Sequence, residues 1–212
     1  MSVKPIFFAL DGKHLDNFSR ELEILKGNIY GVKVGLEMFT SEGPSSVEKL
    51  KKDGWTVFLD LKLHDIPNTV QAAAISAGNI GADYLTIHIA SGKEALLAAK
   101  ESKPENLKLL GVSTALTSKA YSPQISQRVY EEFLLAKESK IDGVICPPSE
   151  LFKTKELFEL IVTPGIRLKN DDSHDQKNIT TPEKAIRDGA RYLVMGRSIR
   201  QNINYVVEKL KL

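Results

Sequence analysis

Short apolar runs alternate with longer amphipathic segments along the whole chain. The runs are rich in β-branched and aromatic residues, which is typical of strands buried on both faces. They lie at Ile6–Leu10, Tyr30–Gly35, Thr56–Leu61, Tyr84–Ile89, Lys108–Ser113, Gly143–Cys146, Leu160–Thr163 and Tyr192–Met195. The pattern therefore predicts eight buried strands.

The segments between these runs carry apolar residues at helical spacing. Helices are expected around Leu15–Leu25, directly after Gly43–Pro44, and at Ala72–Gly78, Ala95–Lys100, Val129–Lys137, Pro182–Asp188 and Ile199–Leu210. Eight strand–helix units predict an α/β fold, a (β/α)8 TIM barrel. A doubly wound open sheet uses the same alternation and is the alternative, but no Gly-x-Gly-x-x-Gly fingerprint follows the first run.

Composition narrows the class of protein. A chain of 212 residues with 42% hydrophobic and 26% charged residues suits one folded domain, which we expect to span residues 1–212. The net charge is only +2 and the charges are dispersed, which disfavours a nucleic-acid partner. No apolar stretch is long enough to cross a membrane or to act as a signal peptide, so a cytoplasmic location is expected. The one cysteine, Cys146, follows an apolar run and is expected to be buried.

Charged and polar residues recur where the predicted strands end, which is where TIM barrels build their active sites. They are Asp11, Lys33, Asp60, Lys62, His88, Thr117, Ser118, Arg167 and Arg197. Most of them can be explained by a structural role alone; a lone Asp after a strand, for example, is usually a turn or helix-capping residue. Lys33 differs because it lies inside an apolar strand, and buried lysines are rare unless they are paired.

The third run carries the sharpest signal. Side chains alternate along a strand, so Asp60 and Lys62 point one way and Leu59 and Leu61 the other. With the leucines in the strand–helix layer, Asp60 and Lys62 face the barrel mouth. A surface salt-bridge cluster is the alternative, but two charges on the inward face of a buried strand are costly to hold without a role.

Two arginines point to an anionic substrate. Barrels often bind phosphate with the loops after strands seven and eight, and here these loops carry Arg167 and Arg197. Gly165 and Gly196 precede them and let backbone N–H groups approach an anion. The histidines show no metal-binding spacing, so no metal site is predicted.

Together these motifs resemble the orotidine 5′-phosphate decarboxylase family almost from end to end. The most specific match is Phe58–Thr69, and the others occur in the family's order. They are Phe8–Asp11, Val32–Gly35, Leu116–Ser118, Val162–Arg167 and Met195–Ser198. The resemblance implies a carboxy-lyase that converts orotidine 5′-phosphate to UMP and CO2 in pyrimidine biosynthesis, without cofactor or metal.

The resemblance also implies an alternating Lys–Asp–Lys–Asp array of four residues. It would consist of Lys33, Asp60 and Lys62 of one chain and Asp65 of a second subunit. Lys62 would deliver the proton to C6 of the pyrimidine. The sites would therefore be shared within a homodimer.

Further residues would bind the substrate according to the same resemblance. Asp11 and Lys33 would hold the ribose hydroxyls, helped by Ile66 and Thr69 from the partner chain. The base would be contacted by Thr117 and Ser118, and the bridge from base to phosphate would be made by Gln176. The phosphate would be surrounded by Arg167, Gly196 and Arg197.

Two other functions fit parts of the pattern. Hexulose-phosphate enzymes of the same superfamily share an Asp-x-Lys-x-x-Asp core but use Mg²⁺, and the set Lys33, Lys62, Thr117, Gln176 and Arg197 favours the orotidine enzyme. A non-catalytic barrel that binds a phosphorylated ligand is the second alternative. The intact Lys62 and both aspartates argue against it.

Overall fold

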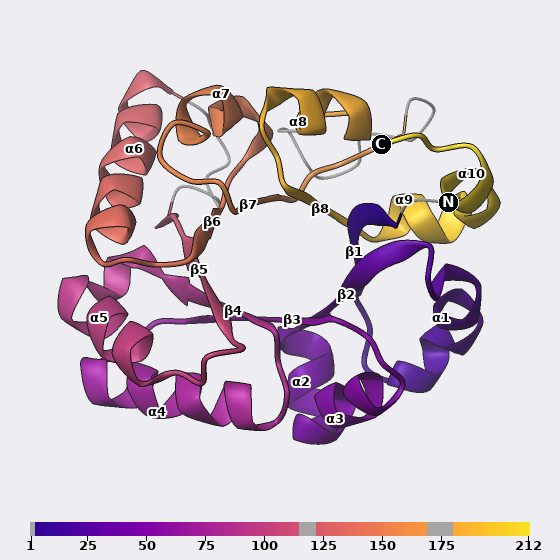
Figure 1. Cartoon of the computed structure of the whole chain (residues 1–212), viewed down its shortest axis with the longest axis horizontal. Coiled ribbons are helices and arrows are strands. Elements are labelled where there is room, and N and C mark those ends of the chain that lie inside the picture. The colour runs from indigo at the N-terminus through magenta and orange to yellow at the C-terminus, as the bar shows by residue number, and fades with distance from the viewer. Residues whose placement is uncertain (1–2, 115–121, 169–179) are drawn as a thin grey trace.

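The computed structural model describes residues 3–114, 122–168 and 180–212, and these form a closed barrel of parallel strands with helices outside it (Figure 1). The strands pair in chain order from β1 to β8, and β8 pairs with β1. They are β1 (Lys4–Leu10), β2 (Ile29–Gly35), β3 (Val57–Leu63), β4 (Tyr84–His88), β5 (Lys108–Val112), β6 (Gly143–Ile145), β7 (Ile161–Thr163) and β8 (Tyr192–Met195). The closed order confirms the (β/α)8 barrel and rules out the doubly wound alternative.

Helices form the outer ring. They are α1 (Ser19–Leu25), α2 (Leu36–Glu42), α3 (Pro44–Lys52), α4 (Pro67–Asn79), α5 (Lys93–Ser102), α6 (Pro123–Glu138), α7 (Leu151–Thr154), α8 (Pro182–Asp188), α9 (Arg197–Gln201) and α10 (Ile203–Glu208). The single closing helix expected over Ile199–Leu210 is wrong, because Asn202 leaves the helical conformation with φ −134° and ψ 35° and separates α9 from α10. Helix α2 was not expected, since Met38 is its one fully buried residue and no apolar stripe marks it.

Two apolar layers hold the barrel together. The inner layer fills the barrel with Phe7, Phe58, Tyr84, Leu110, Val112, Ile145 and Val162. The outer layer, between strands and helices, contains Leu59 together with the partly buried Leu61 and Leu63. Along β3, inner and outer positions therefore alternate as the sequence predicts.

Tyrosines close the barrel at the end where the strands begin. Tyr30, Tyr84 and Tyr192 surround Phe7, whose ring contacts each of them edge-on. The Tyr30 and Tyr84 hydroxyls lie 2.8 Å apart, and the Tyr30 and Tyr192 rings stack with centroids 4.2 Å apart. Burial, together with the hydrogen bond to Tyr192, raises the pKa of Tyr30 to about 12. Bulky rings thus fill this end, and the opposite end carries the charged side chains.

Two aspartates, Asp83 and Asp142, each link an outer helix to the first residues of a strand through the same pair of contacts. Asp83, just before β4, accepts a hydrogen bond from Val57 N (2.7 Å) and pairs with Lys51 of α3 (2.7 Å). Asp142, just before β6, accepts one from Leu109 N (2.9 Å) and one from Lys100 Nζ of α5 (2.6 Å). Each carboxylate therefore links a helix to the strand that follows it and to the next unit of the barrel.

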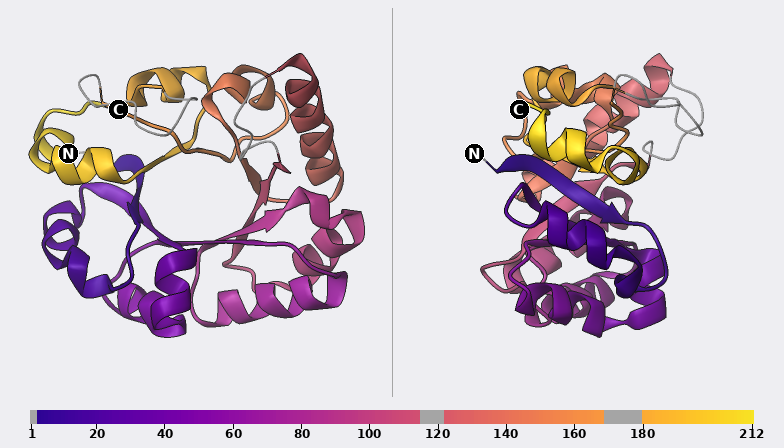
Figure 2. Two further views of the ribbon diagram at one scale, coloured as in Figure 1. Left: turned by 180° about the vertical axis from the view of Figure 1, so that it is seen from behind. Right: turned by 90° about the vertical axis from the view of Figure 1, so that its right-hand side faces the viewer.

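The two ends of the chain meet where the barrel closes. Ile6, Phe7 and Phe8 of β1 pair with Leu193, Val194 and Met195 of β8. Lys4 Nζ donates a hydrogen bond to Val207 O of α10 (2.9 Å). Both views in Figure 2 show the first strand, in indigo, beside the C-terminal helices, in yellow. Within the described ranges, no helix has the length and apolarity that a membrane span requires.

Candidate active site

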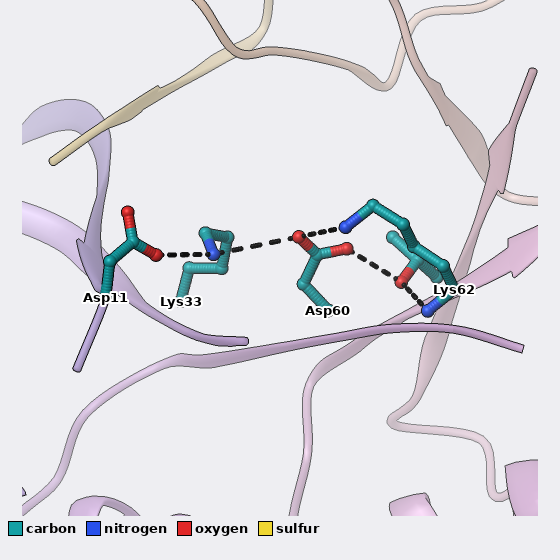
Figure 3. A network of polar contacts seen from close by, with 5 residues as sticks. Asp11, Lys33, Asp60 and Lys62 are labelled. Atoms are coloured by element: carbon teal, nitrogen blue, oxygen red, sulfur yellow. Dashed lines mark hydrogen bonds and ion pairs between the residues drawn. The ribbon is translucent and has the colours of Figure 1, made fainter. Parts of the chain in front are cut away.

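Four side chains of alternating charge, Asp11, Lys33, Asp60 and Lys62, line up at the carboxyl end of the first three strands and form the array of this chain (Figure 3). It contains three residues of the Lys–Asp–Lys–Asp array that the resemblance implies, and Asp11 adjoins them in place of Asp65. Lys33 Nζ of β2 lies 3.3 Å from Asp11 Oδ1, just past β1, and 3.7 Å from Asp60 Oδ2 of β3. Lys62 Nζ, also from β3, lies 2.8 Å from the same Asp60 oxygen. Asp60 therefore lies between two ammonium groups, and the inward face predicted for Asp60 and Lys62 is confirmed.

The array is buried at its centre and open at its edge. The exposed fraction of the side chain is 11% for Lys33 and 13% for Asp60, but 67% for Asp11. Burial by itself would raise the pKa of Asp60, but the charges of Lys33 and Lys62 outweigh it and lower the pKa below its usual value. The carboxylate therefore stays ionised at neutral pH and keeps a fixed negative charge between the two lysines.

A bulge in β3 shapes this part of the site. Leu59 pairs with Leu85 and Leu63 with Ile87, so β3 advances four residues while β4 advances two. Within the bulge Lys62 has φ 50°, a left-handed conformation that non-glycine residues rarely adopt. Functional sites often hold such strain, and here it falls on the proposed proton donor.

Sequence reasoning missed Thr86 of β4. Its Oγ1 accepts a hydrogen bond from Lys62 N (2.8 Å) and donates one to Asp60 Oδ1 (3.0 Å). The sequence could have indicated Thr86 only as a polar residue that alternates with outward-facing residues in a buried strand, and so faces the barrel interior. That signal does not reveal the partner, because the partner depends on how β3 and β4 are paired.

The residues expected to come from a second subunit lie outside the array of their own chain. Asp65 is exposed, and its Oδ1 accepts a hydrogen bond from Ile66 N (2.7 Å). The exposed fraction of Ile66 is 66%, and Thr69, in the first turn of α4, is also exposed. None of these three residues forms a hydrogen bond or ion pair with Lys62 of its own chain.

The two arginines follow β7 and β8, so both lie at the carboxyl end of the barrel, but their surroundings differ. Arg167 is buried, and its Nη1 donates a hydrogen bond to Ile166 O (2.9 Å). Arg197, the first residue of α9, is exposed and forms no ion pair with the residues that the structure describes. A Cβ atom at Gly196 would lie 3.2 Å from Asp11 Oδ2, so the turn after β8 lies directly beside the array.

Three predicted ligands, Thr117, Ser118 and Gln176, lie outside the described residues. The residues that flank them are held at the carboxyl end of the barrel. Thr114 donates hydrogen bonds to Glu132 of α6 from its backbone N (3.0 Å) and its Oγ1 (2.6 Å). Thr180 N donates one to Gly165 O (3.2 Å) in the turn after β7.

The surroundings of His88 and Cys146 give neither residue a role in the array. His88 ends β4 with its ring 5.3 Å from that of His64, and burial, followed by the charges of His64 and Lys62, lowers its pKa. Nδ1 of His88 is buried without a hydrogen-bond partner among the described residues. Cys146 is buried as predicted, and burial raises its pKa to about 12. The described residues contain no cluster of His, Cys, Asp and Glu that could hold a metal ion.

Comparison with known proteins identifies the family. The model of the "Orotidine 5′-phosphate decarboxylase / HUMPS family" matches residues 4–210. The orotidine 5′-phosphate decarboxylase of Fusobacterium nucleatum is 40% identical over 95% of this chain and 91% of its own length. The orotidine 5′-phosphate decarboxylase of Oenococcus oeni is 42% identical over 93% of this chain and 92% of its own length.

A solved structure agrees with the sequence comparisons. The crystal structure of orotidine 5′-phosphate decarboxylase from Lactobacillus acidophilus superposes with a TM-score of 0.77. Its sequence is 32% identical, and the match covers 93% of this chain and 92% of that one. The match therefore extends over most of both chains. This chain belongs to the orotidine 5′-phosphate decarboxylase / HUMPS family.

Proposed function

We propose that this protein is an orotidine 5′-phosphate decarboxylase, which releases CO2 from orotidine 5′-phosphate to form UMP in pyrimidine biosynthesis. The observation that carries the proposal is the ion pair of Lys62 with Asp60 (2.8 Å) at the barrel mouth, in a chain whose relatives bear that name. Both charges belong to one strand and lie on its inward face. Such an array supplies fixed charge at a site of small-molecule chemistry.

The chemistry requires stabilisation of a carbanion. When the bond from C6 to the carboxylate breaks, the electron pair stays on C6, where no adjacent carbonyl delocalises it. The Lys62 ammonium offers positive charge to C6 and then its proton, so that UMP and CO2 leave and Lys62 recovers a proton from solvent. Preorganised charges can contribute several kcal/mol in a site that excludes water. Asp60 orients Lys62 through their ion pair (2.8 Å), and no cofactor takes part.

The remaining site residues bind the nucleotide. Asp11 and Lys33 hold the ribose hydroxyls, and their ion pair (3.3 Å) supports a shared role. Arg167, Gly196 and Arg197 surround the phosphate, and contacts there contribute to the chemical step at C6. Thr117, Ser118 and Gln176 contact the base and its link to the phosphate.

The active unit is a homodimer with shared sites. Asp65, Ile66 and Thr69 are exposed on their own chain, and Asp65 forms no ion pair with its own Lys62, which pairs with Asp60. In the dimer Asp65 completes the partner's array, and Ile66 and Thr69 contact the partner's ribose. We place this assembly in the cytoplasm, with each chain folded as a single domain over residues 1–212.

An absorbance assay tests the activity. Orotidine 5′-phosphate is mixed with the purified protein in excess EDTA, and loss of the substrate's ultraviolet absorbance is followed. Turnover in EDTA is the expected result. No loss of absorbance would refute the proposed function, and turnover of a hexulose phosphate that needs Mg²⁺ would assign the chain to the other branch of its family.

Complementation tests the shared site. The variants Asp65→Ala and Lys62→Ala are each expected to be inactive as homodimers. A mixed dimer carries both defects in one site and none in the other, so an equal mixture that exchanges subunits should recover about a quarter of parental activity. Native mass spectrometry verifies the mixed dimer. Verified mixed dimers without activity would contradict the shared site.

A further inference from the structure

We propose that Thr86 is a positioning residue of the active site, which holds the Asp60 carboxylate and the Lys62 backbone in the arrangement that decarboxylation requires. The inference rests on the proposed function and deepens it. It assigns a role in the reaction to a side chain of β4 that does not belong to the charged array.

The position of Thr86 in the barrel is well defined. Thr86 is fully buried and faces the barrel interior, because Tyr84 belongs to the inner apolar layer and Leu85 and Ile87 belong to the outer one. Its hydroxyl therefore meets β3 at the bulge. It lies beside Asp60 and Lys62, because β4 is the next strand of the barrel after β3.

The direction of each hydrogen bond follows from the chemistry of the groups. The Lys62 backbone N–H can only donate, so Thr86 Oγ1 accepts it at 2.8 Å. The hydroxyl proton then remains available for the ionised carboxylate of Asp60, whose Oδ1 is 3.0 Å away. A hydroxyl has one donor proton and two acceptor lone pairs, so it makes both bonds at once.

These two bonds fix what the reaction uses. The bulge removes Lys62 N from the regular strand pairing, and the Thr86 hydroxyl supplies the partner that holds Lys62 at φ 50°. At the same time Oδ1 of Asp60 is held by Thr86, so Oδ2 is directed at Lys62 Nζ (2.8 Å) and Lys33 Nζ (3.7 Å). Without the hydroxyl, the carboxylate can rotate and the lysine backbone can relax away from this strained conformation.

Steady-state kinetics test the role. Thr86→Val keeps the β-branched shape and removes the hydroxyl, whereas Thr86→Ser keeps the hydroxyl. We expect Thr86→Val to lower kcat by about 10- to 100-fold with KM changed less than about threefold, because a buried bond to a charged group is lost but the ribose and phosphate contacts remain. Thr86→Ser should stay within about threefold of the parent in kcat.

A matched control separates this effect from the loss of any buried hydroxyl. Thr163 of β7 is also fully buried, its position alternates with the inward Val162, and its Oγ1 has no hydrogen-bond partner among the described residues. Thr163→Val should therefore keep the parental kcat. Rates are taken well below each variant's Tm. A parental kcat in Thr86→Val, or an equal loss in Thr86→Ser, would overturn the proposal.

Amide hydrogen exchange gives a readout that does not depend on activity. We expect the Lys62 N–H to exchange slowly in the parent and in Thr86→Ser, and markedly faster in Thr86→Val. Unchanged exchange in Thr86→Val would overturn the positioning role even if kcat fell. If the parent does not decarboxylate the substrate, the proposed function fails, and the exchange measurement still decides whether Thr86 holds Lys62.

Discussion

The Asp60 carboxylate receives hydrogen bonds on both oxygens, from Lys62 at one and from Thr86 at the other. Its charge is the negative centre between two lysines, so the array depends on it more than on any exposed member. Asp11 has a single described partner, Lys33, and is mostly exposed. At the scale of residues, we therefore expect the buried Asp60 to matter more for the array than the exposed Asp11.

Replacing Asp60 by Asn tests this ranking through pH. The lowered pKa of Asp60 means that its ionised form stabilises the folded state above the pKa it has when unfolded, about 4. That contribution is lost as the pH falls through the folded-state pKa. Asp60→Asn should reduce the free energy of unfolding by about 2 kcal/mol at pH 7, and by less below pH ~4. Urea unfolding at several pH values measures it; a difference independent of pH would contradict the assignment.

Lys62 carries the clearest kinetic prediction. Lys62→Ala should lower kcat by at least about 1000-fold, because both the stabilising charge at C6 and the proton are lost. Lys52→Ala on the exposed surface of α3 is the matched control and should behave as the parent. Equal turnover in the two variants would remove Lys62 from the mechanism.

The sequence predicts the residues of the array better than their geometry. Lys33 could be recognised because a charge inside an apolar strand is unusual, and Asp60 and Lys62 because strand alternation puts them on one face. The role of Thr86 could not, since it depends on the irregular pairing of β3 with β4. The burial of Arg167 was also not foreseen, because loop position alone does not determine exposure.

At the scale of elements, the same aspartate contact, here called a joint, links a helix to a strand at two places in the barrel. Asp83 and Asp142 each precede a strand, accept from the backbone of the preceding strand and pair with a lysine of an earlier helix. A side chain that accepts a hydrogen bond from a buried strand N–H stabilises the fold, because that N–H would otherwise be buried without a partner. A surface ion pair adds little in comparison.

Asp142→Ala should therefore destabilise the protein by about 2 kcal/mol, because Leu109 N and Lys100 both lose their partner. The control is Glu138→Ala, which removes an exposed pair with Lys93 (3.4 Å) and should cost less than about 0.5 kcal/mol. Urea denaturation of both variants gives the comparison. Equal losses would show that the Asp142 joint contributes no more than a surface pair.

Element types could be predicted more securely than their boundaries and irregularities. The eight apolar runs fall within one or two residues of the observed strands, because strands buried on both faces are apolar along their length. The break between α9 and α10 and the bulge at Lys62 were not predictable. The bulge depends on how β3 pairs with β4, and the break depends on the backbone conformation of one residue, Asn202. The periodicity of apolar residues carries no information on either.

At the scale of the whole molecule, the barrel has two dissimilar ends. Tyrosine rings fill the end where strands begin, and charges gather where they finish. The filled end supports the barrel without taking part in the chemistry. Its contribution to stability can therefore be measured separately from activity.

Alkaline pH should weaken the filled end. The pKa of Tyr30 is about 12 in the folded protein and about 10 when unfolded, so its neutral form stabilises the fold below pH ~10, and this contribution is lost between pH ~10 and 12. At pH 11 the parent should have lost about 1 kcal/mol more than Tyr30→Phe, relative to pH 9. Tyr205→Phe, at an exposed site, should follow the parent. Parallel pH profiles for the parent and Tyr30→Phe would contradict this.

The pairing of β1 with β8 has a consequence for synthesis. While the ribosome is still making the C-terminal part, β1 has one neighbour, β2, and its other edge is open. Unpaired strand edges invite association with other chains. The nascent chain therefore stays exposed to chaperones and aggregation until residues 192–195 emerge, and Gly196 reaches Asp11 only then. A stalled chain that ends before β8 would hold every residue of the array but no closed barrel around them.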